Sequence, residues 1–389
     1  MRICIYGAGA VGGYLAVGLA SVEGVELSVV ARGAQLAAIH ANGLKLLIGG
    51  EERRCRPRAT DDPAELGVQD YVIVCLKAHQ AWEVAERMRP MLDDDTAVVT
   101  GQNGIPWWYF YGIDKRFESL RLESVDCGQR QWKAIGPQRA ISCVVFPATE
   151  LVAPGVIKHS YGNRFVLGEP DGSLSERCRR LADALKAAGF DAPVVPDIRN
   201  ELWLKLWGNL CFNPVSALTR ATLDIVATQP DLRALCAQMM QEASKVATAY
   251  GVSFRVGMEK RINGAARVGA HRTSMLQDLE GGRPLELDAL LTSVQEMAAR
   301  AHRDALYRRG AGLDAAARTL AAHLSNLSRR RHRAAGSFAD RASIRIGDRP
   351  SCDRASSFLI VRPSVRACGW RGRASIMSGS NTGRPRQSR

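Results

Sequence analysis

Short apolar runs alternate with stretches of helical composition along the first part of the chain. Residues 2–6 and 26–30 form short β-rich runs, residues 70–76 form a nearly continuous apolar run, and residues 96–100 form a fourth. Residues 80–92, between two of these runs, have helical composition. Strands that alternate with helices predict βαβ units, so we expect an α/β fold with an N-terminal, Rossmann-type doubly wound sheet.

The pattern changes further along the chain. Between about residues 141 and 167, strand and turn residues predict sheet hairpins in place of crossover helices, and the proline-spaced residues 191–197 predict a linker. From residue 198 to about residue 300, proline is rare and apolar residues recur at helical spacing, which predicts a second, all-α domain. The expected units are a nucleotide-binding domain over 1–196, a helical domain over 197–325 and an Arg-rich, disordered tail over 326–389.

The formal net charge of +14 suggests at first a phosphate-rich partner, such as a nucleic acid or an anionic membrane. Residues 301–389, however, hold 19 of the 53 basic and five of the 39 acidic residues, so the first 300 residues carry 34 of each sign. This neutral main body disfavours nucleic acid and membrane as partners. A nucleic-acid-binding protein that uses the basic tail remains an alternative, and it predicts salt-dependent binding that disappears on deletion after Leu324.

Ten cysteines are scattered along the sequence with no C-x-x-C pair. This spacing indicates free thiols in a reducing compartment, and neither a zinc site nor a disulfide framework. The first β-rich run begins at Arg2, which leaves no room for a secretory signal, and no apolar stretch approaches the ~18 residues needed to span a bilayer. We expect a cytoplasmic protein.

A glycine-rich loop follows the first predicted strand. Its residues are Gly7, Ala8, Gly9, Ala10, Val11 and Gly12. They fit G-x-G-x-x-G between a strand and a helix, where the glycines permit a tight turn, a close approach to a pyrophosphate and close helix packing. The second strand ends at Arg32, where NAD-binding loops carry an acid, and a guanidinium there can pair with a 2′-phosphate. We therefore expect NADPH/NADP+ as the cofactor; the alternative for Arg32 is a solvated loop charge.

Lys205, Asn209 and Asn213 recur at intervals of four among large apolar residues. On a helix they form one polar stripe, which faces either solvent or a site. The residues alone leave both readings open.

An ordered set of motifs over roughly residues 1–300 resembles the ketopantoate reductase family. The motifs are the glycine loop, Arg32, CLKAHQ with Lys77 and Gln80, the Gln102-Asn103-Gly104 turn, the Lys205–Asn213 stripe, SMLQD and LELD. The resemblance implies NADPH-dependent reduction of a small 2-oxo acid without a metal, most simply 2-dehydropantoate to (R)-pantoate in pantothenate biosynthesis. The alternatives are a related reductase of another 2-oxo acid and a non-catalytic NADP-binding protein.

The resemblance also implies residue roles. Lys205 would be the catalytic general acid, and Glu286 would lie beside it, orient it and keep it protonated. Substrate-binding residues would be Asn103, Asn209, Asn213 and Ser274. Cofactor-binding residues would be the glycine loop, Arg32, Lys77, Gln80, Asn103 and Glu286. The helical domains of such enzymes can dimerise, so a homodimer is a further expectation.

The chain departs from the family pattern after Asn213, where residues 217–223 offer only threonines and an arginine as polar groups, and in two further places. The aromatic residues Trp107 to Phe110 follow the Asn103 turn, and they either reshape the substrate cavity or pack between the domains. After Arg300 the usual terminal helical segment is missing, yet codons can be chosen for residues 302–312 that encode such a segment one base later. We hypothesise a frameshift near Arg300, with the Arg-rich remainder translated out of frame.

Overall fold

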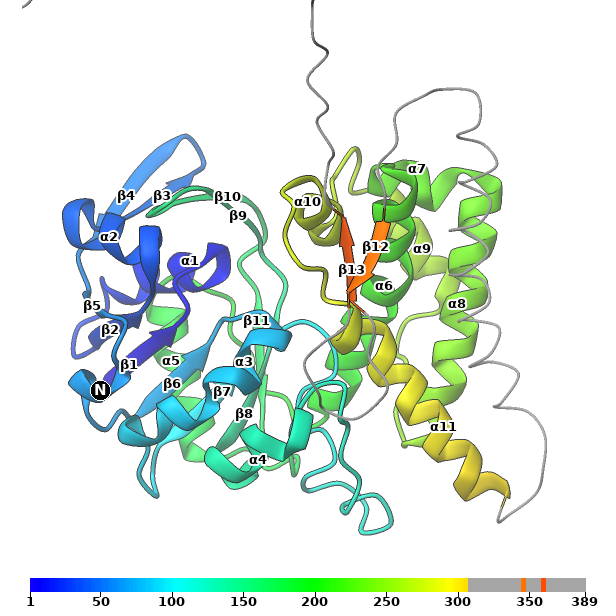
Figure 1. The fold of residues 1–389 in the computed structure, drawn as a ribbon, viewed down its shortest axis with the longest axis horizontal. Coiled ribbons are helices and arrows are strands. Elements are labelled where there is room, and N and C mark those ends of the chain that lie inside the picture. The colour runs from blue at the N-terminus through cyan, green and yellow to red at the C-terminus, as the bar shows by residue number, and fades with distance from the viewer. Residues whose placement is uncertain (307–343, 348–357, 362–389) are drawn as a thin grey trace, which may run out of the picture.

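The computed structural model describes residues 1–306, 344–347 and 358–361, which form an N-terminal α/β domain beside a bundle of helices (Figure 1). A seven-stranded sheet forms the centre of the α/β domain. All its neighbouring strands are parallel except the last pair, in which β11 runs antiparallel to β8. The strand order is β5 (Arg58–Thr60), β2 (Glu26–Val30), β1 (Arg2–Tyr6), β6 (Tyr71–Val74), β7 (Ala97–Thr100), β8 (Ala140–Val145) and β11 (Phe165–Gly168).

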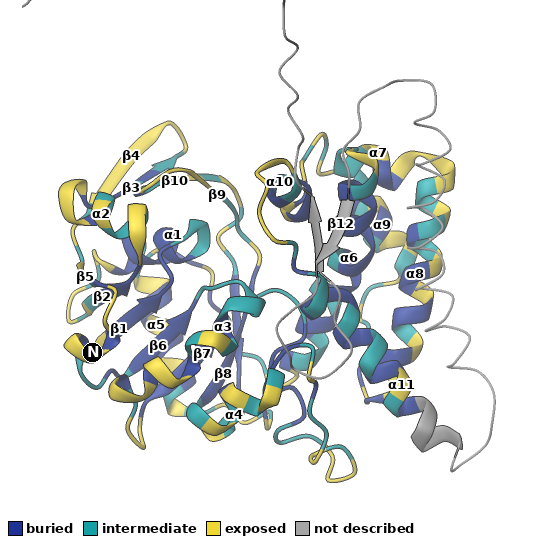
Figure 2. Cartoon of the chain, in the orientation of Figure 1, coloured by how far each residue is buried: buried dark blue, intermediate teal, exposed yellow. Residues whose placement is uncertain are grey.

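Helices cover both faces of this sheet because its strands alternate apolar side chains between the faces. In β1, Ile3 and Ile5 pack with α1 (Ala10–Leu19) and α5 (Glu176–Ala187). Cys4 and Tyr6 pack on the opposite side with α3 (Ala78–Val84) and the 3-10 helix η2 (Ala85–Met91). Figure 2 shows the central strands buried along their length. The doubly wound α/β fold is confirmed.

The order of the strands reverses between β1 and β6. In open α/β sheets, ligands bind beyond the carboxyl ends of the strands at such a switch point. The glycine loop follows β1 and Lys77 follows β6, so the fold brings these two predicted site segments to the same crevice.

A second sheet and several short elements complete the N-terminal domain. The second sheet has the order β4 (Glu51–Cys55), β3 (Leu44–Ile48), β10 (Val156–Tyr161) and β9 (Ala148–Ala153). The predicted hairpin region is divided between the sheets: β9 and β10 pair antiparallel here, and β8 and β11 pair antiparallel in the seven-stranded sheet. The sequence prediction did not include β3, β4 and β5. The other elements are α2 (Gly33–Asn42), α4 (Arg130–Ala134), η1 (Pro63–Leu66), η3 (Cys127–Gln129) and η4 (Pro137–Arg139).

Every regular element between residues 198 and 306 is a helix, so the second domain is all-α, as predicted. Its central helix, α6, buries Trp203, Trp207 and Leu210 against neighbouring helices and also contacts β8 and β11 of the first domain. Among the described residues, we find no helix with the length and apolar character that a membrane span requires. The helices are α6 (Ile198–Thr219), α7 (Leu223–Thr228), α8 (Pro230–Ala249), α9 (Met258–Ala266), α10 (Ser274–Glu280), the π-helix η5 (Asp288–Thr292) and α11 (Ser293–Leu306).

Three local predictions need correction. Residues 80–92 are not one helix: α3 ends at Val84, and the following 3-10 turn contains Pro90, which lacks a backbone N–H. Residues 191–197 are not a free linker, because Asp191 and Val194 form parallel bridges with β11 and the residue before it. Within the tail expected to be disordered, β12 (Ile344–Gly347) and β13 (Phe358–Val361) pair antiparallel; the rest of that prediction lies outside the described residues.

The aromatic run after Asn103 packs between the two domains. Trp107 and Trp108 are buried in the core of the sheet's second face, and Trp108 donates from Nε1 to Thr100 Oγ1 at 3.1 Å. Tyr109 and Phe110 are buried instead in the helical core. These four residues therefore join the two cores and do not line an open cavity.

Candidate active site

The glycine loop packs tightly against α1 at Gly12, whereas its backbone at Gly9 is not covered by other residues. Gly7 has φ +105°, and its N–H donates to the Val30 carbonyl at 2.9 Å. A Cβ on Gly12 would lie 2.0 Å from the Gly7 carbonyl oxygen, whereas a Cβ on Gly9 would meet nothing within 4 Å. The bond from Gly13 N–H to the Gly9 carbonyl is 2.8 Å long and belongs to the first turn of α1, so the preceding N–H groups lack helical acceptors. An open backbone surface at a helix N-terminus fits a pyrophosphate.

Arg32 and Gln35 flank this loop. Arg32 directly precedes α2, is exposed, and has no ion pair to a carboxylate of the described residues, so its guanidinium is available to a phosphate. The Gln35 side chain donates to the Ala8 carbonyl at 2.5 Å and accepts from Gly155 N–H at 2.9 Å. Gln35 thus braces the loop against the second sheet. This role could not be predicted from the sequence, because Ala8 and Gly155 lie 27 and 120 residues from Gln35.

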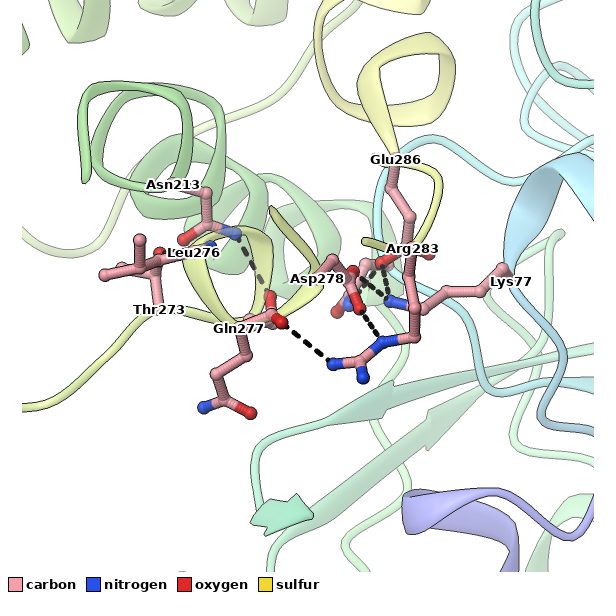
Figure 3. Close-up of polar contacts among 10 residues, drawn as sticks. Lys77, Asn213, Thr273, Leu276, Gln277, Asp278, Arg283 and Glu286 are labelled. Atoms are coloured by element: carbon pink, nitrogen blue, oxygen red, sulfur yellow. Dashed lines mark hydrogen bonds and ion pairs between the residues drawn. The ribbon is translucent and has the colours of Figure 1, made fainter. Parts of the chain in front are cut away.

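Lys77 connects the two domains through an ion-pair cluster (Figure 3). Its Nζ lies 2.8 Å from Asp278 Oδ2 and 2.9 Å from Glu286 Oε2. Both carboxylates are buried, and Glu286 Oε2 also lies 3.4 Å from Asn103 Nδ2. Burial alone would lower the pKa of Lys77, but Glu286 and Asp278 together raise it above its ordinary value. Lys77 therefore stays a cation held by two anions.

Lys205 is half-buried on α6, and its ammonium donates to the carbonyl of Val145 at the end of β8. Burial lowers the pKa of Lys205 from 10.5 to about 8, against the opposing fields of Glu286 and Cys143. The sequence prediction paired Glu286 directly with Lys205. In the structure the carboxylate contacts Lys77 and Asn103, whereas the Lys205 ammonium donates to the Val145 carbonyl. Glu286 therefore acts on Lys205 only electrostatically.

Both ends of the polar stripe of α6, Lys205 and Asn213, contact other protein groups. Asn209 is half-buried, and Asn213 is 6% exposed, with its Nδ2 lying 3.5 Å from Ser274 Oγ. Ser274 is exposed and begins α10, where Thr273 caps the helix by accepting from Leu276 N–H. The stripe therefore runs from the end of β8 at Lys205 to the start of α10 at Asn213.

The turn after β7 places Asn103 next to the helical domain. Gly104 has φ +90°, and a Cβ there would lie 2.2 Å from the Ala289 carbonyl. The same carbonyl accepts from Ile105 N–H at 3.0 Å, which ties the turn to the π-helix η5. Gln102 donates to the Leu76 carbonyl at 2.9 Å and so links the ends of β6 and β7. Gln80 is half-buried in the first turn of α3, three residues after Lys77.

Comparison with known proteins agrees with these arrangements. The family model for ketopantoate reductase PanE/ApbA matches residues 3–172, and the model for its C-terminal part matches residues 197–309. A 2-dehydropantoate 2-reductase from Mesorhizobium japonicum is 53% identical over 297 residues, which cover 76% of this chain and 91% of that protein.

Solved structures give the same result. A Ralstonia solanacearum protein assigned to the ketopantoate reductases is 38% identical, with a TM-score of 0.76 over 85% of this chain and 98% of its own. The 2-dehydropantoate 2-reductase of Geobacter metallireducens is 26% identical, with a TM-score of 0.69 over 84% of this chain and 99% of its own. Since matched models span both domains and a curated relative is more than half identical, the chain belongs to the ketopantoate reductase family of oxidoreductases.

Proposed function

We propose that this protein reduces 2-dehydropantoate to (R)-pantoate with NADPH, a step of pantothenate biosynthesis. The observation that carries the proposal is Lys205, a half-buried lysine at the end of β8 with a pKa lowered to about 8. An acid whose pKa lies near neutral pH is suited to give up its proton during turnover. The activity of the M. japonicum relative supports the choice of substrate.

Bound NADPH supplies the hydride that turns the ketone carbon into a secondary alcohol carbon. Negative charge then develops on the ketone oxygen, and the Lys205 ammonium stabilises this charge and donates the proton that completes the hydroxyl. Asn209, Asn213 and Ser274 hold the carboxylate and hydroxyl of the substrate. Amides and hydroxyls suit this task because they do not titrate near neutral pH.

Cofactor binding is proposed at the crevice between β1 and β6. The open backbone at Gly9 takes the pyrophosphate, and Arg32 pairs with the 2′-phosphate, which gives the preference for NADPH. Lys77, Gln80, Asn103 and Glu286 complete the site toward the nicotinamide.

The proposed location is the cytoplasm, and free thiols at all eight described cysteines support it. The homodimer stays a prediction, to be tested by light scattering on the purified protein. A reductase of another 2-oxo acid and a non-catalytic NADP-binding protein remain the competing functions.

Initial rates of NADPH oxidation with a panel of 2-oxo acids test the proposal. We expect the highest kcat/KM with 2-dehydropantoate and a lower value with NADH. A higher kcat/KM with another 2-oxo acid would transfer the assignment to that substrate. NADPH binding without turnover of any member of the panel would favour the non-catalytic protein.

A further inference from the structure

Arg283 lies in the turn after α10 and folds back onto that helix (Figure 3). Its backbone N–H donates to the Asp278 carbonyl at 2.8 Å, and its Nη2 donates to the Gln277 carbonyl at 3.0 Å. Its Nε donates to Asp278 Oδ1 at 2.9 Å. Two contacts with Asp278 and one with Gln277 therefore fix Arg283 against the end of α10.

Two glycines make this return of the chain possible. A Cβ on Gly281 would lie 2.4 Å from Arg283 Nη1, and Gly282 has φ +63°, a conformation that other residues rarely adopt. The Gly281-Gly282 turn thus leaves room for the guanidinium beside the end of α10. Capping the end of α10 would not by itself require a turn that leaves this space.

Arg283 stands at the outer end of a row of alternating charges. Asp278 is 4% exposed and uses one oxygen for Arg283 and the other for Lys77. Lys77 in turn contacts Glu286, which approaches Asn103. The row therefore joins an exposed arginine to two residues of the proposed site.

Lys77 is shared between Asp278 and Glu286, and its position between them depends on the other ion pairs that each carboxylate makes. Without Arg283, buried Asp278 would have Lys77 as its remaining cation and would draw the ammonium toward itself, because an unpaired buried charge is costly. Glu286 would then be less neutralised. Glu286 already acts on Lys205 electrostatically, so its field there would grow. Cys143 also acts on Lys205 electrostatically. Glu286 acts in addition on His79, together with Lys77, Glu83 and Asp288.

We propose that Arg283 is a positioning residue for the reduction: by holding Asp278, it keeps Lys77 shared with Glu286 and so keeps Glu286 and Asn103 in place. This inference rests on the proposed function. The competing reading is that Arg283 only caps the carboxyl end of α10, as basic side chains often do.

The variants R283Q and R272Q separate these two readings. Arg272 is a matched control, since it pairs with Glu280 of the same helix at 3.0 Å and its side chain is 52% exposed, against 55% for Arg283. We expect R283Q to lower kcat/KM for 2-dehydropantoate about 10- to 100-fold, the effect of a small displacement at a reacting site. The alkaline limb of its pH profile should also move to higher pH. The kcat/KM of R272Q should stay within about twofold of the parent value, because an exposed ion pair contributes little.

R283K keeps a cation beside Asp278 and should recover most of the activity; it also serves as the second variant if R283Q does not fold. A melting temperature that falls equally in R283Q and R272Q, with kcat/KM and the pH limb unchanged, would leave Arg283 as a helix cap and overturn the proposal.

A crystal structure of R283Q provides a readout that needs no turnover. We expect the Lys77 ammonium to leave Glu286, and a contact preserved at 2.9 Å would contradict the inference. If the parent protein does not reduce 2-dehydropantoate, the proposed function fails, while this structure still decides the role of Arg283.

Discussion

Replacing Lys205 by methionine keeps a side chain of similar length and removes the proposed proton donor. Loss of a general acid typically lowers the rate by about 10²- to 10⁴-fold. The fall should lie in kcat as well as in kcat/KM, because the proton is transferred during the chemical step. Rates are measured as loss of NADPH absorbance with 2-dehydropantoate as substrate.

The lowered pKa of Lys205 adds a pH dependence to this prediction. Only the protonated lysine can act as an acid, so kcat/KM should fall about tenfold between pH 7 and pH 9 if the pKa is about 8. The K205M variant should lack this limb. A parent rate that is flat over this range, or a K205M rate within about tenfold of the parent, would refute the assignment.

Stability should move in the opposite direction over the alkaline range. The pKa of Lys205 is about 8 in the folded protein and 10.5 in its ordinary state, so between these values the unfolded chain binds more protons. The free energy of unfolding therefore rises with pH in this window, by at most about 3 kcal/mol from this residue. Urea unfolding of the parent protein and of K205M across this range isolates the contribution. A difference between the two proteins that stays constant with pH would contradict it.

Three further substitutions test other parts of the account. Arg32→Glu should lower kcat/KM for NADPH about 10- to 100-fold with little change for NADH, because it removes a charge-assisted bond to the 2′-phosphate; Arg54→Glu on the exposed strand β4 is the control, and an equal loss for both cofactors would refute the role. Gly9→Ala should fold normally but weaken NADPH binding, whereas Gly12→Ala should lower the melting temperature, because its Cβ would lie 2.0 Å from the Gly7 carbonyl. The reverse pattern in calorimetric titration and thermal melts would contradict the loop assignment. Trp203→Ala should cost about 3–5 kcal/mol in urea unfolding, since the side chain is fully buried and donates to Tyr109 Oη at 2.7 Å; a cost below 1 kcal/mol would contradict its place in the core.

The sequence predictions that the structure confirms depend on residues that are close together in the chain. The strand at 2–6, the glycine loop and α1 follow one another directly, so spacing alone defined them. Strand β4 gave no such signal because it is almost entirely polar and exposed, and β5 has only three residues. Strand β3 is a mostly apolar run of five residues, but its parallel partner β10 lies in a separate part of the chain, outside the alternation of strands and helices. The 3-10 turn after α3 was missed because its composition up to Pro90 suits an α-helix equally well.

Contacts between distant residues could not be read from the sequence. Lys77 lies 201 residues from Asp278 and 209 from Glu286, so their ion pairs depend on how the two domains meet. The same holds for the bond from Lys205 to the Val145 carbonyl, which directs the ammonium toward β8. The motifs therefore identified the members of the candidate site, and only the structure showed that Glu286 pairs with Lys77.

The frameshift hypothesis concerns the chain after Arg300, most of which lies outside the described residues. The aligned region covers 91% of the M. japonicum relative, and the family model for the C-terminal part ends at residue 309. The end of the family model agrees with a loss of family pattern near that point. The nucleotide sequence decides the matter: a second frame that encodes the family's terminal helical segment supports the hypothesis, and its absence rejects it.

The central claim is tested most directly by analysis of the product. The purified protein is incubated with 2-dehydropantoate and NADPH, and pantoate is separated and quantified by chiral chromatography alongside the NADPH consumed. We predict one (R)-pantoate for each NADPH oxidised by the parent protein and almost none from K205M. NADPH that binds without forming pantoate, or equal pantoate formation by K205M, would contradict the account of Lys205 as the proton donor of a 2-oxo acid reductase.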